Sequence, residues 1–230
     1  MNIHELDLLD RQLIQVINGS DSVFWDYVMY TVTDTFSWSL VIVALLIVVF
    51  RNNTWKESLA ILLLIGLLIT AADQLCSGLT KPIVGRWRPT QDPELMYYID
   101  IVNGYRGGRF GFFSGHACNT FCMATFLSFL FRSAKVTSVL YFWSLTTTFT
   151  RLYLGVHYLG DVIVGFIVGF ILGYVFHLIH KLVAKRFGHN KLVSLQFTSS
   201  GYLKSDLNAF LAVVFFNYIC VIIVAMTRGF

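Results

Sequence analysis

Long runs of apolar residues dominate the chain and predict helices that cross a membrane. A bilayer span needs about 20 mainly apolar residues. Five stretches qualify as spans, although some of their apolar cores are short: Val28–Phe50, Ser58–Leu79, Ala117–Phe131, Val162–His180 and Ala209–Met226. A sixth stretch, Val136–Leu154, is rich in threonine and aromatic residues but carries no charge until Arg151. The pattern therefore predicts an all-α fold, a polytopic transmembrane helical bundle with about six spans.

The N-terminal segment follows a different pattern. From Leu6 to Ile17, apolar residues recur at roughly helical spacing between charged ones, and Asn18-Gly19-Ser20 is a typical helix stop. Two interpretations are open: an amphipathic helix lying in the membrane interface, which we favour, or a terminal cap packed on the bundle. The segment lacks the basic start and long apolar core of a signal peptide. We therefore expect membrane targeting to reside in the spans themselves.

Composition supports an integral membrane protein and excludes an ordinary soluble domain. Of the 230 residues, 56% are hydrophobic and only 13% are charged, and the mean hydropathy is +0.67. A soluble domain would carry about 25% charged residues. The length fits one domain over residues 1–230. No run of Lys and Arg resembles a nucleic-acid tract, so we expect no nucleic-acid partner. The cysteines lie singly in apolar stretches, where they are expected to be buried small residues.

The distribution of basic residues predicts the orientation in the membrane. With six spans, one side receives nine of them: Arg51, Lys56, Arg132, Lys135, Lys181, Lys185, Arg186, Lys191 and Lys204. The other side receives eight: Arg11, Lys81, Arg86, Arg88, Arg106, Arg109, Arg151 and Arg228. Six of these eight lie in or beside clusters that substrate binding would hold in place. Discounting them, the positive-inside rule places the nine-residue side in the cytoplasm. The clusters and both termini then face outward, towards the periplasm of a bacterial inner membrane.

A few polar and small residues inside the apolar stretches need a separate interpretation. Asp34 and Asp73 fall within or near predicted spans, where a carboxylate is expensive and often functional. Both lie close to a predicted membrane surface, which favours a structural role. Gly165, Gly169 and Gly173 recur every four residues on one helix face, a spacing that allows two helices to pack closely.

Three basic and histidine-bearing clusters fall where apolar segments end, all on the same predicted side. They are K-P-I-V-G-R-W-R-P (Lys81–Pro89), F-S-G-H (Phe113–His116) and T-R-L-Y-L-G-V-H-Y-L-G-D (Thr150–Asp161). Together they supply fixed cations, two imidazoles and a carboxylate. Such a set of side chains can bind a phosphate, attack it and protonate the leaving group. Because the rest of the chain is mostly membrane, we expect the phosphate to belong to a lipid.

Phosphate binding needs fixed cations or oriented N–H groups around the equatorial oxygens. Lys81 and Arg88 are seven residues apart, which is two turns if the helix continues, although the proline after each also permits an extended turn. Arg151 offers a forked guanidinium that suits two phosphate oxygens. Ser114-Gly115 precedes a predicted helix, whose N-terminal N–H groups favour an anion.

The histidines supply the remaining chemistry. His157 and Asp161 are four residues apart, so on a helix they would share a face. The carboxylate would fix the imidazole tautomer and leave the other ring nitrogen free to attack, with His116 as the acid that protonates the leaving oxygen. No Asp, Glu and His cluster suggests a metal, and no cofactor is expected. His177 and His180, at the opposite end of the predicted bundle, are interpreted as structural.

These residues resemble the type 2 phosphatidic acid phosphatase (PAP2) superfamily. Its pattern is K-x6-R-P, then P-S-G-H, then S-R-x5-H-x3-D. This chain matches it with Lys81 and Arg88-Pro89, with Ser114-Gly115-His116, and with Arg151, His157 and Asp161, at the family's spacings. The match covers residues 81–161. Two positions depart: Phe113 stands where the family usually has Pro, and Thr150, which keeps a hydroxyl, where it usually has Ser.

The resemblance implies a metal-independent lipid phosphatase. A phosphohistidine would form on His157, oriented by Asp161, and His116 would act first as the acid and then as the base that activates water. The phosphate would be bound by Lys81, Arg88, Ser114, Gly115 and Arg151. As a small outward-facing member, the chain resembles the bacterial phosphatases of undecaprenyl diphosphate, lipid A or phosphatidylglycerophosphate. Arg106 and Arg109 could contact a second phosphate of such a lipid or anionic lipid generally. A lipid phosphotransferase and a non-catalytic membrane transport component are the alternatives.

Overall fold

The computed structural model describes residues 3–187 and 194–228, and within these ranges the regular structure is helical. The α-helices are α1 (Ile3–Ile17), α2 (Val23–Thr33), α3 (Ser39–Asn52), α4 (Trp55–Asp73), α5 (Lys81–Val84), α6 (Gly115–Phe131), α7 (Ala134–Tyr153), α8 (Leu159–Phe187) and α9 (Lys204–Arg228). A π-helical turn, Gln74–Thr80, joins α4 to α5, and 3-10 turns cover Thr35–Trp38, Pro89–Gln91 and Val102–Gly104.

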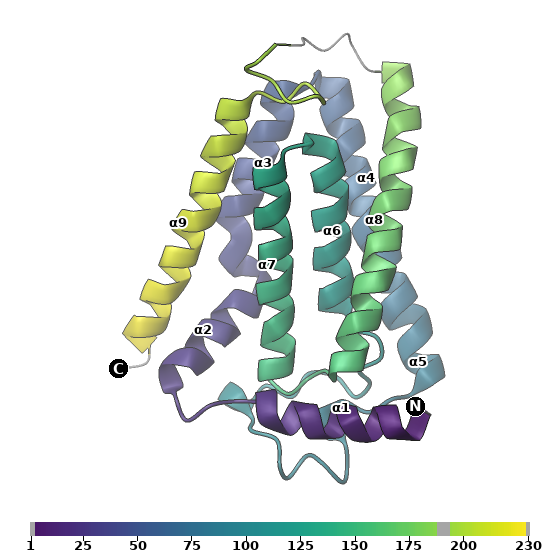
Figure 1. The fold of residues 1–230 in the computed structure, drawn as a ribbon, viewed down its shortest axis with the longest axis vertical. Helices are drawn as coiled ribbons and strands as arrows, with labels where there is room; N and C mark the ends of the chain where they lie inside the picture. The colour runs from purple at the N-terminus through teal and green to yellow at the C-terminus, as the bar shows by residue number, and fades with distance from the viewer. Residues whose placement is uncertain (1–2, 188–193, 229–230) are drawn as a thin grey trace.

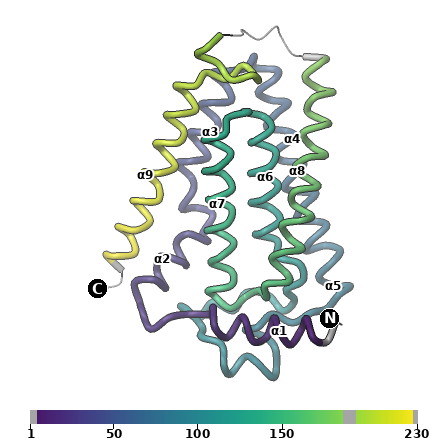
Figure 2. The backbone as a smooth tube through the Cα atoms, viewed as in Figure 1, coloured from purple at the N-terminus to yellow at the C-terminus, as the bar shows by residue number. Residues whose placement is uncertain are grey.

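The long helices run side by side as one bundle, and α1 lies across one end of it (Figure 1). In the view of Figure 2, α6, α7 and α8 stand in front of α3 and α4, with α9 and α2 at the flank. The connection from α5 to α6 lies at the same end as α1, as do the α7–α8 turn and the C-terminal end of α9. The elements that carry the three polar clusters therefore meet at one end of the bundle.

The all-α expectation is confirmed, and so is the integral membrane character. Among the described residues, four helical segments are long and apolar enough to cross a bilayer: Thr35–Asn52, Trp55–Val84, Leu159–Lys185 and Lys204–Thr227. The last three contain the expected stretches and extend beyond them, because helices continue into the charged residues that flank each apolar core. The remaining two expected stretches coincide closely with α6 and α7.

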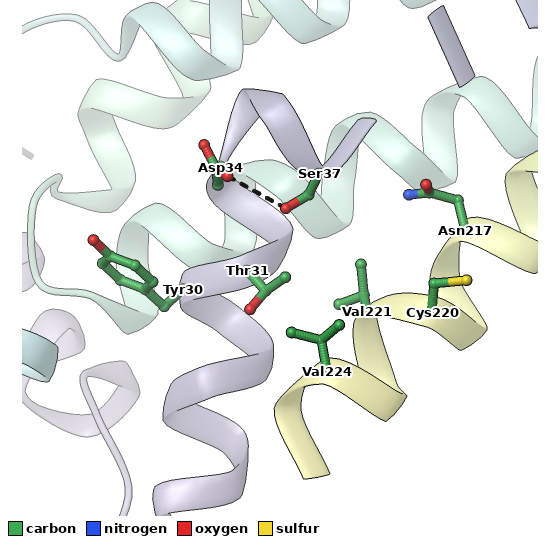
Figure 3. A pocket seen from close by; sticks show the side chains of 8 residues that line it. All are labelled: Tyr30, Thr31, Asp34, Ser37, Asn217, Cys220, Val221 and Val224. Carbon is green, nitrogen blue, oxygen red and sulfur yellow. Dashed lines mark hydrogen bonds between the residues drawn. The ribbon is translucent and has the colours of Figure 1, made fainter. Parts of the chain in front are cut away.

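The expectation of one continuous span over Val28–Phe50 is wrong, because the helix breaks at Asp34 (Figure 3). The Asp34 carboxylate accepts hydrogen bonds from the backbone N–H of Phe36 at 3.3 Å and from the Ser37 hydroxyl at 3.4 Å. A short acidic side chain that binds nearby backbone groups competes with the helix and starts a new one. Asp34 thus has the structural role that the sequence favoured.

A cavity of about 190 Å³ lies beside this break, between α2 and α9 (Figure 3). Its wall consists of Tyr30, Thr31, Asp34, Ser37, Asn217, Cys220, Val221 and Val224. None of the residues of the three basic clusters lines it. The cavity is therefore separate from the residues that the sequence marks for phosphate chemistry.

The α6–α8 contact is the closest helix pairing near the clusters, and the glycine stripe makes it possible. A Cβ atom on Gly165 would lie 2.8 Å from the Ser114 carbonyl oxygen, and one on Gly169 would lie 2.7 Å from the Cys118 carbonyl oxygen. Each side chain larger than hydrogen would push the two backbones apart. The packing role predicted for these glycines is confirmed, and it brings the N-terminal ends of α6 and α8 together.

Helix α1 is packed on the bundle as a cap. Its residue Ile14 is buried with Tyr158 and Val162 in one apolar cluster. The helix ends at the predicted stop, where the Asn18 side chain donates to the Tyr153 carbonyl oxygen at 2.8 Å and Gly19 adopts a left-handed φ of 67°. Packing on the bundle, as the cap interpretation expects, is therefore observed, while the exposed Leu6, Leu8 and Leu9 also give the helix an apolar outer side, as the interfacial interpretation expects.

We expect Gly169→Ala to destabilise the bundle, because the added methyl group would meet a backbone oxygen that cannot move without shifting α6. Overpacking of this kind lowers the free energy of unfolding by about 1–3 kcal/mol. Gly66→Ala, in α4, is the matched control, since nothing lies within 4 Å of its Cβ position. It should be neutral or stabilising by up to about 1 kcal/mol. Thermal unfolding in detergent measures both, and equal stability of the two variants would contradict the packing argument.

Candidate active site

The three sequence clusters come from different elements and meet beside α1. Lys81 begins α5, Arg88 follows it on an extended segment, and Arg151 lies in the last turn of α7. Ser114 caps α6, whose first residues are Gly115 and His116. His157 lies in the turn before α8, and Asp161 lies in the first turn of that helix.

The segment between Lys81 and Arg88 is not a continuous helix. Helix α5 ends at Val84, and Gly85 takes a left-handed φ of 62° that glycine adopts without strain. Arg88 has extended backbone angles, and its N–H donates to the Arg109 carbonyl oxygen at 3.2 Å. Of the two arrangements that the sequence allowed, the shared helix face is wrong and the extended turn is observed.

His157 and Asp161 form a buried pair, although not through a shared helix face. His157 precedes the helix, so its ring reaches Asp161 across the turn that starts α8. The ring nitrogen Nδ1 lies 3.4 Å from Oδ2 of Asp161, and both side chains are almost fully buried. The backbone N–H of Tyr158 donates to the same carboxylate oxygen at 3.1 Å. The carboxylate is therefore held in place from the start of α8.

Arg88 fixes the protonation of the His157 ring. Its Nη1 lies 3.3 Å from Nε2 of His157. Since a guanidinium has no acceptor, Nε2 must accept, and the ring proton is then on Nδ1, facing Asp161. The same Nη1 donates to the Val156 carbonyl oxygen at 3.1 Å, and Nε donates to that of Phe110 at 3.2 Å. Arg88 therefore lies directly beside the unprotonated ring nitrogen.

The site is strongly electropositive. Burial and, next, the charges of Arg88 and Arg151 hold the pKa of His157 well below its ordinary value of 6.5. Burial and the neighbouring Arg151 charge also lower the pKa of Arg88. Because these buried positive charges repel one another, the site strongly favours the binding of an anion.

Arg151 is buried and is held by two neutral side chains. Its Nη1 donates to the Thr33 hydroxyl at 2.7 Å, and its Nη2 donates to the Tyr105 hydroxyl at 2.8 Å. The Nε atom is buried and has no hydrogen-bond partner in the described part of the chain. A buried donor without a partner is costly. This donor is therefore available to a phosphate oxygen.

The N-terminus of α6 supplies backbone donors at the same place. A Cβ atom on Gly115 would lie 3.9 Å from Nζ of Lys81 and 3.3 Å from Sγ of Cys76, so the ammonium lies against this turn. His116 is the second residue of α6, so its side chain starts from this same turn. The N–H of Ser114 donates to the Asp161 carbonyl oxygen at 3.0 Å, which links the start of α6 to α8.

Several residues at the site escaped the sequence argument. Arg86, inside the first cluster, forms an ion pair with Asp161. Thr33 and Tyr105 hold Arg151, and no local pattern marked either of them. Arg106 donates to the Thr90 carbonyl oxygen at 3.1 Å, and the Arg109 guanidinium stacks on Trp87 at 4.5 Å. Across residues 3–187 and 194–228, no group of three or more His, Cys, Asp or Glu side chains is placed to hold a metal ion.

His177 and His180 lie apart from this centre. His177 stacks on Phe129 at 4.8 Å between ring centroids, and His180 meets the edge of Phe126. Both are on the half of α8 that is remote from Asp161. They agree with the structural role expected from the sequence.

Comparison with known proteins places this geometry in a family. The model of the PAP2 superfamily matches residues 59–185, more than half of the chain. The chain belongs to the PAP2 superfamily. A lipid A 4′-phosphatase of Bacteroides thetaiotaomicron is 42% identical over 186 residues, which cover 80% of this chain and 82% of the relative. A lipid A 4′-phosphatase of Porphyromonas gingivalis is 33% identical over 157 residues, 68% of this chain and 66% of the relative.

A solved structure shares the fold of this PAP2 protein. It is a transmembrane PAP2-type phosphatidylglycerolphosphate phosphatase from Bacillus subtilis, and the superposition has a TM-score of 0.59 at 21% sequence identity. The match covers 78% of this chain and 88% of the other. The resemblance deduced from the three sequence motifs is thus confirmed, as is the helical membrane fold that it implied.

The low pKa of His157 predicts activity at mildly acidic pH. A histidine whose pKa is depressed stays neutral, and able to attack, down to a lower pH. After correction for ionisation of the substrate phosphate, kcat/KM at pH 6 should be within about twofold of its value at pH 7, because this ratio reports the free enzyme. The measurement is a pH series of phosphate release. An acid limb centred near the ordinary value of 6.5 for histidine would contradict the burial argument.

Proposed function

We propose that this membrane lipid phosphatase removes the 4′-phosphate of lipid A through a phosphohistidine on His157. The observation that carries the mechanism is the line of contacts from Arg88 through the His157 ring to Asp161. It leaves Nε2 of His157 unprotonated and places a guanidinium next to it. A phosphate bound to that guanidinium lies beside the attacking nitrogen.

The first step forms the covalent intermediate. The lone pair of Nε2 attacks phosphorus, the P–O bond to the lipid breaks, and His116 gives its proton to the departing oxygen. As the ring becomes an imidazolium, the Asp161 carboxylate stabilises the charge through Nδ1–H. Lys81, Arg88 and Arg151, with the Ser114 hydroxyl and the Gly115 N–H at the start of α6, hold the equatorial oxygens, where charge is spread in the transition state.

The second step releases inorganic phosphate. Water attacks phosphorus on the side opposite the histidine nitrogen, and His116, now neutral, takes the proton of the water. The P–N bond breaks and its electron pair returns to Nε2, which restores His157. Over the two steps His116 gives one proton and takes one, and Nε2 of His157 gives one electron pair and regains it. The proposed cycle therefore requires no metal.

The choice of lipid rests on the relatives. Both curated relatives are named lipid A 4′-phosphatase, and one of them aligns over most of its own length. Arg109 is exposed and stacks on Trp87, next to Arg88 in the chain, which supports a contact between this guanidinium and a further anionic group of such a lipid.

The membrane placement that fits this function has six crossings, by α3, α4, α6, α7, α8 and α9. Helices α6 and α7 are packed among the four apolar segments, and their 17 and 20 residues suffice to cross a bilayer. The basic residues remote from the site lie at the other end of the bundle, apart from Lys191, which is outside the described residues. The site then faces the periplasm, α1 lies at the interface, and residues 1–230 act as one domain.

Substitution of the proposed catalytic histidines should separate them from the structural ones. His157→Ala and His116→Ala should each reduce phosphate release to background, since one removes the nucleophile and the other the proton donor. His177→Ala, at the opposite end of α8, should keep at least roughly half of the wild-type rate. Initial rates in detergent, with thermal unfolding as a check on folding, measure all three. Near-normal turnover by either of the first two variants would overturn the assigned roles.

A lipid panel tests the substrate. With 4′-phosphorylated lipid A, undecaprenyl diphosphate and phosphatidylglycerophosphate, we expect kcat/KM to be highest for lipid A by about tenfold or more. Inorganic phosphate should appear in step with the dephosphorylated lipid. A preference for another lipid would refute the substrate while leaving the phosphatase intact. Phosphate found on a second lipid instead of in solution would indicate the phosphotransferase.

A further inference from the structure

Arg86 lies between helix α1 and Asp161, the carboxylate that faces the proposed nucleophile His157. Its Nη1 is 2.8 Å from Oδ1 of Asp161, while its Nη2 is 2.8 Å from Oδ1 of Asp7 and 3.0 Å from Oδ2 of Asp10. The two ends of one guanidinium fork thus join the first turn of α8 to α1. Burial opposes the charge of Arg86, but the carboxylates of Asp161, Asp10 and Asp7 outweigh it and raise the pKa of Arg86 above its ordinary value. Arg86 is therefore permanently charged.

Both oxygens of Asp161 are consequently occupied. Oδ1 receives Nη1 of Arg86, and Oδ2 receives the backbone N–H of Tyr158 while facing Nδ1 of His157. His157 is neutral, so among the described residues Arg86 is the cation that pairs with Asp161. A buried carboxylate that loses its cation is left uncompensated, which is strongly unfavourable. The orientation of the His157 ring therefore depends on Arg86.

Helix α1 in turn holds Arg86 in position. The Asp10 carboxylate also accepts the backbone N–H of Gly160 at 3.0 Å, next to Asp161 in the chain. A Cβ on Gly160 would lie 2.6 Å from Oδ2 of Asp10, so this position needs glycine for the approach. The Tyr158 ring covers the Arg86 guanidinium at 4.3 Å. The acidic face of α1 is thus fixed to the start of α8 at two points.

We propose that Arg86, anchored by Asp7 and Asp10 of α1, is a positioning residue that holds the Asp161 carboxylate against His157. The inference rests on the proposed role of His157 and extends the active site to a helix outside the family motifs. Arg86 does not touch the phosphate; it acts by keeping the orienting carboxylate charged and aligned. Helix α1 accordingly helps to orient the nucleophile, in addition to covering the end of the bundle.

The test compares Arg86→Met, Arg86→Lys and an Asp7→Asn/Asp10→Asn double variant, using lipid A in detergent micelles. Loss of an outer partner of a catalytic group typically costs about 10–100-fold in activity. We expect Arg86→Met to lower kcat by this amount with KM nearly unchanged, because the phosphate ligands remain. Arg86→Lys restores a cation beside Asp161 without the fork, so it should recover part of kcat. The double variant, which leaves Asp161 paired but frees Arg86 from α1, should lie between Arg86→Met and wild type.

Arg51→Met is the matched control. Arg51 lies in the last turn of α3, at the end of the bundle remote from the site, and pairs there with Asp206. Because the Arg51 side chain is exposed, loss of this ion pair should leave kcat within about twofold of wild type. The proposal is overturned if Arg51→Met lowers kcat as much as Arg86→Met, or if folded Arg86→Met keeps wild-type kcat. Where Arg86→Met does not fold, wild-type kcat in both Arg86→Lys and the double variant overturns it. In those cases an inactive His157→Ala would leave the proposed function standing, whereas an active His157→Ala would refute that function itself.

Discussion

The burial of Asp161 is the constraint on which the active-site end of the bundle depends. A carboxylate with no exposed surface must be paired and hydrogen-bonded, or the fold loses more than the residue contributes. Arg86 and the Tyr158 N–H meet that requirement on one side, and His157 faces the carboxylate on the other. The pairing thereby fixes the ring of His157 and the start of α8. It also ties both to α1 through the same arginine.

The close α6–α8 packing converts this local requirement into a complete site. Because glycines let the two backbones approach, the N–H of Ser114 reaches the Asp161 carbonyl oxygen, and the two helices begin beside one another. Helix N-termini carry partial positive charge and free N–H groups. The start of α6 therefore lies beside the start of α8, which carries Asp161. A bulkier α8 face would move this pair of helix ends apart.

The sequence predicted the class of fold and the chemical groups better than it predicted their backbone. Apolar runs located the long helices, because burial in lipid demands them, but the break at Asp34 depends on side-chain hydrogen bonds that hydropathy does not measure. The spacing of His157 and Asp161 correctly suggested contact, although the expected helix face is replaced by a turn. Thr33 and Tyr105 were beyond reach, since their contacts with Arg151 join segments far apart in the chain.

The cations at the site fall into two groups that differ in their bonding partners. Among the described residues, Lys81, Arg88 and Arg151 form no ion pair with a carboxylate, and their hydrogen bonds go to carbonyl oxygens, hydroxyls or an imidazole. Arg86, only two residues before Arg88, is instead surrounded by three carboxylates. Neutral acceptors fix the position of a guanidinium without cancelling its charge, whereas carboxylates cancel it. The first group therefore retains its positive charge, as its proposed phosphate-binding role requires, and Arg86 retains only the geometry needed to hold Asp161. Two arginines in one short motif thus serve opposite electrostatic purposes, which sequence letters alone do not distinguish.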